Sequence, residues 1–296
     1  MQTKRQIQQL LSSAGVKPNK RLGQHFLIDL NLMRLLIDSA ALRKNDVVLE
    51  VGCGTGSLTQ ELAERAGMVL TVEYDSTLAK ITRRQLSGFN NVMIFNIDVL
   101  KNKNTITDSI TEAMVLAKDK YNGRVLLVSN LPYNVASSVM VNLVTGPVKA
   151  DEMYVTVQRE VAERMAAGPG NKDYGILSIF LSVSGQVKTI RVLKPSVFWP
   201  QPQVDSAMIS FVRDEEKSGR IHNIEIFKDV VNLFMGHRRK MLKACSKLTG
   251  GKLKEIHEWA TIFEDCAIDP HERGEELSPE NYIAIANLCA EYLRTK

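Results

Sequence analysis

Residues 47–56 join an apolar, β-branched run to three alternate glycines: Val47-Val48-Leu49-Glu50-Val51-Gly52-Cys53-Gly54-Thr55-Gly56. The apolar run is typical of a buried parallel strand, and a helical pattern begins at residue 57. Glycine has no Cβ, so this turn can bend sharply and let a ligand touch the backbone. Free N–H groups at the start of a helix also favour an anionic or polar ligand group. The stretch therefore predicts a strand–turn–helix unit with a ligand site at the turn.

Two acids follow at the ends of the next apolar strands. Residues 68–72 end in Glu73, about 20 residues beyond the turn, where doubly wound folds place an acid that binds ribose hydroxyls. Residues 92–97 are closed by Asp98. Because ligands of open α/β sheets lie at the carboxyl ends of the strands, we expect Glu73 and Asp98 to face the same site.

The spacing of the glycines separates two classes of ligand. Dinucleotide enzymes usually show G-x-G-x-x-G, with the pyrophosphate on the helix. Here the spacing is G-x-G-x-G and Glu50 precedes it, which resembles motif I of the S-adenosylmethionine methyltransferases. An ordinary strand–turn–helix corner is the alternative, and the two strand-end acids count against it.

Strands and helices alternate up to residue 213, and the pattern is helical beyond it. Residues 187–192 and 207–212 look like two closing strands, naturally antiparallel. The predicted fold class is α/β: a doubly wound, Rossmann-like methyltransferase sheet, mostly parallel with an antiparallel closing strand, plus a small all-α C-terminal domain. The expected domains are a basic arm (1–20), a methyltransferase domain (21–213) and a helical domain (214–296). Further expected segments are a charged linker at 214–220 and helices at 105–118, 226–235, 239–248 and 253–263.

The composition limits the class of protein. Hydrophobic residues make up 44% and charged residues 24% of the chain, as in ordinary globular proteins. No apolar stretch approaches the roughly 20 residues that span a bilayer, so no membrane partner is expected. The four cysteines are scattered, which argues against a zinc site or disulfide frame and for a reducing compartment. The net charge of +5 permits a polyanionic partner without requiring one.

Residues 1–28 contain no acid, and residues 6–11 fit one amphipathic helix. Three interpretations remain open: a solvated arm, an arm that lies along nucleic-acid phosphates, or an organelle transit peptide. The last is the weakest, since arginine and serine are sparse.

The stretch Asn130-Leu131-Pro132-Tyr133 follows the predicted strand 125–129. The exocyclic amine of adenine is a poor nucleophile, and hydrogen-bond acceptors help it to become pyramidal and reactive. The Asn130 side-chain oxygen and the Leu131 carbonyl can both accept, and the following proline restricts Leu131 to an extended conformation. Tyr133 offers a flat surface on which an extruded base can stack. This pattern suits methylation of an amino group, although Asn-x-Pro-Tyr alone is also an ordinary turn.

Motifs over nearly the whole chain after residue 20 resemble the small-subunit ribosomal RNA adenine dimethyltransferases of the KsgA/RsmA type, which are class I S-adenosylmethionine-dependent methyltransferases. They are residues 22–29, the glycine turn, 130–134, 158–164, 174–178, 195–206, 238–240 and 276–280. The resemblance implies transfer of methyl groups from S-adenosylmethionine to N6 of two adjacent adenosines, in small-subunit rRNA or a subunit precursor. It also implies a cytoplasmic protein, expected to be a monomer, with a role in subunit maturation.

The resemblance assigns roles to individual residues. Cofactor contacts are implied for His25, Leu27, Gly52, Glu73, Asp98 and Asn130. Glu73 would hold the ribose hydroxyls and Asp98 the adenine amine of the cofactor. The implied catalytic residues are Asn130, Leu131, Tyr133 and Phe198, with Phe198 as the second aromatic wall opposite Tyr133. His25 departs from the family pattern, in which many members carry asparagine; no metal is implied.

A basic cluster of Arg238, Arg239 and Lys240 is expected to open a helix. A run of charged residues usually forms a solvent-exposed face without a binding role. In this family the small helical domain faces rRNA, which favours phosphate contact.

Three rival functions remain. An Erm-like large-subunit rRNA methyltransferase shares the catalytic motifs. A catalytically idle ribosome-assembly or transcription factor would not need the intact acids and Asn130-Leu131-Pro132-Tyr133. A nicotinamide dehydrogenase would need a pyrophosphate site and a hydride-handling residue, and we find neither in the sequence.

Overall fold

The computed structural model describes residues 1–19, 22–103 and 105–294. Their contacts divide the chain into two compact units. Unit 1 comprises Met1–Ala162 and Val187–Val212, and unit 2 comprises Glu163–Gln186 and Arg213–Lys296.

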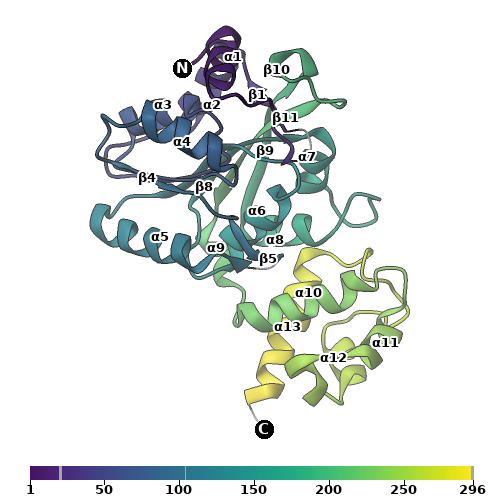
Figure 1. The fold of residues 1–296 in the computed structure, drawn as a ribbon. Coiled ribbons are helices and arrows are strands. Elements are labelled where there is room, and N and C mark those ends of the chain that lie inside the picture. Colours follow the sequence, from purple (N-terminus) through teal and green to yellow (C-terminus); the bar gives the residue numbers. More distant parts are fainter. Residues whose placement is uncertain (20–21, 104, 295–296) are drawn as a thin grey trace. The chain divides into compact units, whose positions relative to one another are not determined.

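A seven-stranded mixed sheet forms the centre of unit 1 (Figure 1). Its strands are β2 (Val47–Val51), β3 (Met68–Val72), β4 (Val92–Phe95), β7 (Val125–Asn130), β8 (Glu152–Gln158), β9 (Gly185–Leu193) and β11 (Ser206–Arg213). Their order in the sheet is β4-β3-β2-β7-β8-β11-β9. The five strands from β4 to β8 run parallel, and β11 pairs antiparallel with β8. The predicted fold class, a mostly parallel sheet with an antiparallel closing strand, is confirmed.

Helices cover both faces of this sheet, because its central strands are apolar on both sides. Every residue of β2 is buried, as are the first five of β7. In Figure 1, α2, α3 and α4 lie on one face and α5 and α6 on the other. The bounds are α2 (Leu30–Ser39), α3 (Ser57–Arg65), α4 (Ser76–Gln85), α5 (Asp108–Tyr121), α6 (Ala136–Thr145) and α7 (Arg159–Ala166).

The N-terminal segment of unit 1 forms helix α1 (Lys4–Ser13). Thr3 and Gln6 form a capping box at its start. The helix buries Ile7 and Leu11, so it is not a solvated arm. The predicted boundary between residues 20 and 21 lies outside the described residues.

Two short strands join distant parts of unit 1. Strand β1 (Phe26–Leu27) pairs antiparallel with β10 (Phe198–Trp199), which follows the 3-10 turn η2 (Pro195–Val197). Leu27 lies opposite Phe198 in this ladder. The proline-rich loop is thereby held against the segment that precedes α2.

Unit 2 is helical and has its own aromatic core. Phe234 lies at the centre, with its ring 5.8 Å from Trp259, 6.2 Å from Phe263 and 6.5 Å from Tyr282. The Tyr282 hydroxyl donates to the Gly274 carbonyl at 2.8 Å, so its polar end is satisfied inside the core. The elements are α8 (Ile176–Ser184), α9 (Glu215–Gly219), α10 (Ile224–Gly236), α11 (Leu242–Cys245), η3 (Ser246–Leu248), η4 (Gly251–Glu255), α12 (Trp259–Asp265) and α13 (Pro279–Arg294).

Two predicted segments of the chain differ in the structure. The helix expected at 105–118 begins only at Asp108, because Leu100–Asn102 (β5) and Thr105–Ile106 (β6) form a small antiparallel pair first. β-branched threonine and isoleucine favour such extended pairing. The expected charged linker at 214–220 contains helix α9, which Asp214 caps by accepting from the Lys217 N–H at 3.1 Å.

Two of the C-terminal helices are shorter than the sequence pattern predicts, whereas α10 extends beyond the expected range 226–235 at both ends. The helix expected at 239–248 is reduced to α11 and η3, and the turn before it carries the basic cluster. The helix expected at 253–263 is replaced by η4 and then α12, which begins at Trp259. Buried aromatic contacts to Phe234 fix the start of α12. Residues 163–186, expected in the first domain, pack with the helices of unit 2.

Candidate active site

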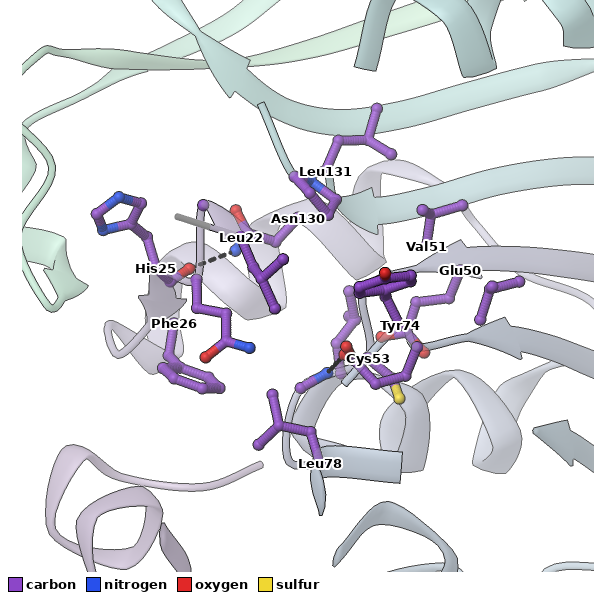
Figure 2. Close-up of a pocket in the computed structure, with 18 of the residues that line it drawn as sticks. Leu22, His25, Phe26, Glu50, Val51, Cys53, Tyr74, Leu78, Asn130 and Leu131 are labelled. Atoms are coloured by element: carbon purple, nitrogen blue, oxygen red, sulfur yellow. Dashed lines mark hydrogen bonds between the residues drawn. The ribbon is translucent and has the colours of Figure 1, made fainter. Parts of the chain in front are cut away.

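A cavity of about 350 Å³ opens in unit 1 at the carboxyl ends of the parallel strands (Figure 2). It is lined by the glycine turn after β2, by residues at the ends of β3, β4 and β7, and by the loop that leads into β1. Its size falls in the range of small-molecule sites, about 300–1,000 Å³.

The glycine turn is shaped by close contacts as well as by its conformation. Gly52 and Gly54 have φ angles of 81° and 59°, which side-chain-bearing residues rarely adopt. A Cβ at Gly52 would lie 2.9 Å from the Pro132 ring, and one at Gly54 would lie 2.8 Å from the Phe26 ring. The turn therefore packs directly against both loops that border the cavity.

Glu73 ties the end of β3 to this turn. One carboxylate oxygen accepts the Gly54 N–H and the other accepts the Asp75 N–H, both at 2.9 Å. Burial raises the pKa of Glu73, and the backbone hydrogen bonds from Asp75 and Gly54 oppose this rise. Its carboxylate lines the cavity and keeps lone pairs for further hydroxyl donors.

Glu50, at the base of the cavity, is fully buried. One of its oxygens accepts the hydroxyls of Thr59 at 2.6 Å and Thr71 at 2.8 Å. Burial raises the pKa of Glu50 to about 7. The hydrogen bonds from Thr59 and Thr71 lower this pKa, and the nearby carboxylate of Glu73 raises it further. Glu50 thus joins β2 to α3 and to β3.

Asn130 lies where β7 leaves the sheet, and both ends of its amide are engaged. Its Nδ2 donates to the His25 carbonyl at 2.8 Å, a bond drawn in Figure 2, and its Oδ1 accepts the Thr156 hydroxyl. The Leu131 N–H donates to the Thr156 carbonyl at 3.1 Å. Thr156 on β8 thereby holds both the Asn130 side chain and the adjoining peptide.

Tyr133 is fixed at its ring and at its hydroxyl. The His25 ring stacks on it with centroids 5.7 Å apart and planes 27° apart. The Tyr133 hydroxyl is 2.9 Å from the Ser206 hydroxyl, and His25 Nδ1 is 2.6 Å from the Pro200 carbonyl oxygen. His25, predicted as a cofactor contact, therefore also contacts the expected target side of the cavity.

The structure brings most of the predicted cavity residues together. Those that line the cavity are His25, Leu27, Gly52, Glu73, Asp98, Asn130, Leu131 and Tyr133. Phe198 does not line it: the residue is 1% exposed and belongs to the same buried core cluster as Leu27 and Met33. The β1–β10 pairing turns the Phe198 ring inward.

The basic cluster belongs to unit 2. Arg238, Arg239 and Lys240 are exposed in the turn between α10 and α11. Arg238 Nε is 3.6 Å from a carboxylate oxygen of Glu275, and its Nη1 donates to the Lys172 carbonyl at 3.3 Å. The cluster therefore precedes a helix instead of opening one.

Sequence reasoning missed several residues at the cavity. Thr156 and Ser206 hold Asn130 and Tyr133, and Ile7 of α1 contributes to the cavity lining. The amphipathic pattern of residues 6–11 signalled a buried helix face but not the surface that it covers. In the described part of the chain, no group of three or more His, Cys, Asp or Glu side chains is placed to hold a metal ion. Within the same residues, no helix has the length and apolarity needed to cross a membrane.

The cavity suits a nucleoside-bearing ligand. The carboxylates of Glu73 and Asp98 can accept hydrogen bonds from hydroxyl and amine groups, while Phe26 and Leu78 add apolar surface along one side (Figure 2). A sheet of this order, with a glycine turn after β2 and acids at the ends of the next two strands, defines a Rossmann-like methyltransferase.

Comparison with known proteins gives the family within this class. The family model described as ribosomal RNA adenine dimethylase matches residues 15–291. The chain is 36% identical over 291 residues to "Ribosomal RNA small subunit methyltransferase A" of Alkaliphilus oremlandii, covering 98% of each chain. It is 35% identical to the protein of the same name from a Geobacillus strain, covering 96% of each. The chain belongs to the ribosomal RNA adenine dimethylase family.

Two solved structures share the fold. One is a dimethyladenosine transferase from Plasmodium falciparum, with a TM-score of 0.66 and 21% identity, which covers 87% of this chain and 94% of that one. The other is the 23S rRNA methyltransferase ErmE, with a TM-score of 0.58 and 23% identity; the match covers 88% of this chain and 98% of that one. At these identities the likeness concerns the fold alone.

Proposed function

We propose that this protein transfers methyl groups from S-adenosylmethionine to N6 of two adjacent adenosines in small-subunit rRNA and so takes part in maturation of the small ribosomal subunit. The family membership and the names of the relatives support the substrate class. The observation that carries the proposal is the amide of Asn130, which is hydrogen-bonded at both ends and lines the same cavity as Tyr133 and Glu73. We expect a monomer that works in the cytoplasm, where small subunits assemble.

The donor side of the cavity would hold S-adenosylmethionine, which supplies an electrophilic methyl group when bound. Glu73 would accept the ribose hydroxyls, since its buried carboxylate retains free lone pairs. Asp98 would accept the adenine amine of the donor. His25, Leu27 and Gly52 line the same cavity and would complete the contact surface.

The acceptor side would prepare the target amine. Thr156 donates its hydroxyl to the Asn130 oxygen, so this oxygen faces a fixed direction and keeps a second lone pair for an adenine amine. The Leu131 carbonyl would accept the other amine hydrogen. Two acceptors draw the amine nitrogen out of conjugation with the ring and make it nucleophilic. Because these groups are held in place beforehand, they need little reorganisation during the reaction.

Tyr133 would stack on the extruded base. One face of its ring is already covered by His25, so the base would use the other face. The burial of Phe198 does not support its predicted role as the opposite wall.

Methyl transfer with separated substrates tests the proposal. Under-methylated small subunits, large subunits and naked rRNA are incubated with labelled S-adenosylmethionine, and the modified nucleosides are identified. We expect N6,N6-dimethyladenosine in the small subunits. Label confined to large subunits would favour the Erm-like alternative, and no transfer to any RNA would favour an idle assembly or transcription factor.

The basic cluster of unit 2 would contact rRNA phosphates. Replacing Arg238 and Arg239 together with glutamate should weaken binding of small subunits by about tenfold or more at low salt and flatten the salt dependence of binding. The affinity for S-adenosylmethionine should not change. Equal subunit binding by variant and parent across a salt series would show that the cluster is an ordinary solvated face.

A further inference from the structure

Helix α1 forms part of the donor side of the cavity. Ile7 is 1% exposed, and together with Leu11 it packs against Leu78 and Ile81 of α4. Ile7 and Leu78 both line the same cavity as Glu73. A segment that the sequence pattern assigned to a basic arm therefore supplies a wall of the ligand site.

Gln2, just before this helix, is bonded to the glycine turn itself. Its Nε2 donates to the Thr55 carbonyl at 3.1 Å, and its Oε1 accepts the Thr55 hydroxyl at 2.6 Å. Its backbone N–H donates to the Ser57 hydroxyl at 2.7 Å. Gln2 is 8% exposed and Thr55 is 1% exposed. Buried polar groups are costly to leave unpaired, so this reciprocal pair favours a docked segment.

The opposite face of α1 is polar and makes no comparable contact. Lys4, Arg5, Gln8 and Gln9 are exposed, while Ile7 and Leu11 are buried. The helix is thus held by one apolar face and by the polar contacts of the two residues that begin the segment: Gln2 bonds Thr55 and Ser57, and the Met1 ammonium lies 3.0 Å from a Glu61 carboxylate oxygen. Such a segment can detach without unfolding the sheet behind it, because no strand of the sheet passes through it.

We propose that Gln2 and the buried face of α1, formed by Ile7 and Leu11 and here together called the N-terminal clasp, belong to the donor-binding site and retain the bound donor. Ile7 closes the apolar side of the cavity next to Phe26 and Leu78, and the Gln2–Thr55 pair holds the glycine turn in its binding shape. The donor exchanges quickly only when the clasp lifts. This inference rests on the proposed function, since it takes S-adenosylmethionine as the donor.

A pair of matched variants tests the clasp. Ile7→Asp places a charge on the buried face of α1, and Gln9→Asp places the same charge on its exposed face. Binding of S-adenosylhomocysteine, the donor product, is measured by calorimetry and by stopped-flow dissociation on the full chain, with any tag placed after residue 296. We expect Ile7→Asp to raise the dissociation constant about tenfold or more, mainly through faster dissociation. We expect Gln9→Asp to stay within about twofold of the parent.

The polar pair is tested by a double-mutant cycle. Gln2→Met and Thr55→Val each remove one partner of the reciprocal bonds. If the pair acts as one unit, each variant should speed dissociation of S-adenosylhomocysteine, and the double variant should be little worse than the worse single one. Fully additive effects would overturn the role of the pair.

Hydrogen exchange on the parent protein keeps the test valid if Ile7→Asp does not fold. Backbone amides of α1 should exchange more slowly when S-adenosylhomocysteine is bound, because ligand and clasp then stabilise each other. Unchanged exchange with saturating ligand would overturn the proposal. If the parent binds no S-adenosylhomocysteine, the proposed function fails first. If the parent binds it and Ile7→Asp binds equally well, only the clasp fails.

Discussion

The donor and acceptor sides of the cavity are built from contacts of very different range. On the donor side, Gly54 and Glu73 bond across 19 residues, within one strand–helix–strand unit. On the acceptor side, Asn130 bonds His25 across 105 residues, and His25 contacts Pro200 across 175. The bond between the glycine turn and Glu73 can therefore form as soon as β2 and β3 pair, whereas the acceptor side needs three distant loops to meet. We expect variants on the two sides to differ accordingly.

The largest expected effect concerns a residue that the sequence assigned to the acceptor side. Phe198→Ala should lower the free energy of unfolding by about 3–5 kcal/mol, because it leaves a cavity in the buried core cluster that also contains Leu27. Denaturant unfolding measures the change. Phe198→Leu keeps an apolar side chain but removes the ring, and it should methylate subunits at close to the parental rate. A severe loss of turnover in a stable Phe198→Leu protein would restore Phe198 as a wall of the base pocket.

The next effect separates chemistry from donor binding. Asn130→Ala removes a fixed acceptor for the target amine and should slow single-turnover methylation of small subunits by about 10²–10³-fold. The affinity for S-adenosylhomocysteine should change much less, because an interaction used mainly in the transition state adds little to ground-state binding.

Glu73→Ala on the donor side is the matched control. It should weaken donor binding by about 1–3 kcal/mol, through loss of charged hydrogen bonds. At saturating donor its single-turnover rate should stay closer to the parent's than that of Asn130→Ala. Parental single-turnover rates in Asn130→Ala would remove this residue from the mechanism, and unchanged donor affinity in Glu73→Ala would count against the placement of the ribose.

A third effect concerns the buried carboxyl beneath the donor side. Glu50 has a pKa of 4.5 when freely solvated and about 7 in the folded protein. Between these values the native state binds more protons than the unfolded state, so the free energy of unfolding falls as the pH rises. Glu50→Gln keeps acceptors for Thr59 and Thr71 but cannot ionise. At pH 8 it should be more stable than the parent by up to about 3 kcal/mol.

This advantage should vanish as the pH approaches 4.5, where the parent also carries a neutral Glu50. Thermal unfolding from pH 4.5 to 8 measures it. Glu64→Gln on the exposed face of α3 is the control and should follow the parent's pH profile. Parallel profiles for Glu50→Gln and the parent would show that Glu50 does not take up a proton on folding.

The smallest expected effect concerns the hydrogen bond between the hydroxyls of Tyr133 and Ser206 on the acceptor side. Tyr133→Phe keeps the ring and its stacking on His25 but loses the contact with the Ser206 hydroxyl. The lost hydrogen bond is worth about 0.5–1.5 kcal/mol, which corresponds to a twofold to tenfold lower kcat/KM for subunit methylation. Ser206→Ala should give a similar loss, and the double variant little more. A double loss equal to the sum would mean that the two hydroxyls act independently.

The parts of the fold and site that the sequence predicted well share one property. The parallel strands, the glycine turn, Glu73 and Asp98 follow from continuous apolar runs and glycine spacing within short segments. Two of the differences lie where helices depend on packing. Aromatic contacts to Phe234 fix the start of α12, and residues 163–186 join unit 2 through contacts with distant helices. No local pattern contains those contacts.

By itself the sequence determined the ligand end of the sheet, because a strand, a glycine turn and an acid at the next strand end are local choices of backbone and side chain. Only the tertiary structure decided which residues face the cavity. The β1–β10 pairing turns Phe198 into the core, and the packing of α1 on α4 brings Ile7 to the cavity wall. The physical reason is that strand register and helix docking depend on contacts between apolar surfaces far apart in the chain. The direction in which each side chain points is set only when these surfaces pack together.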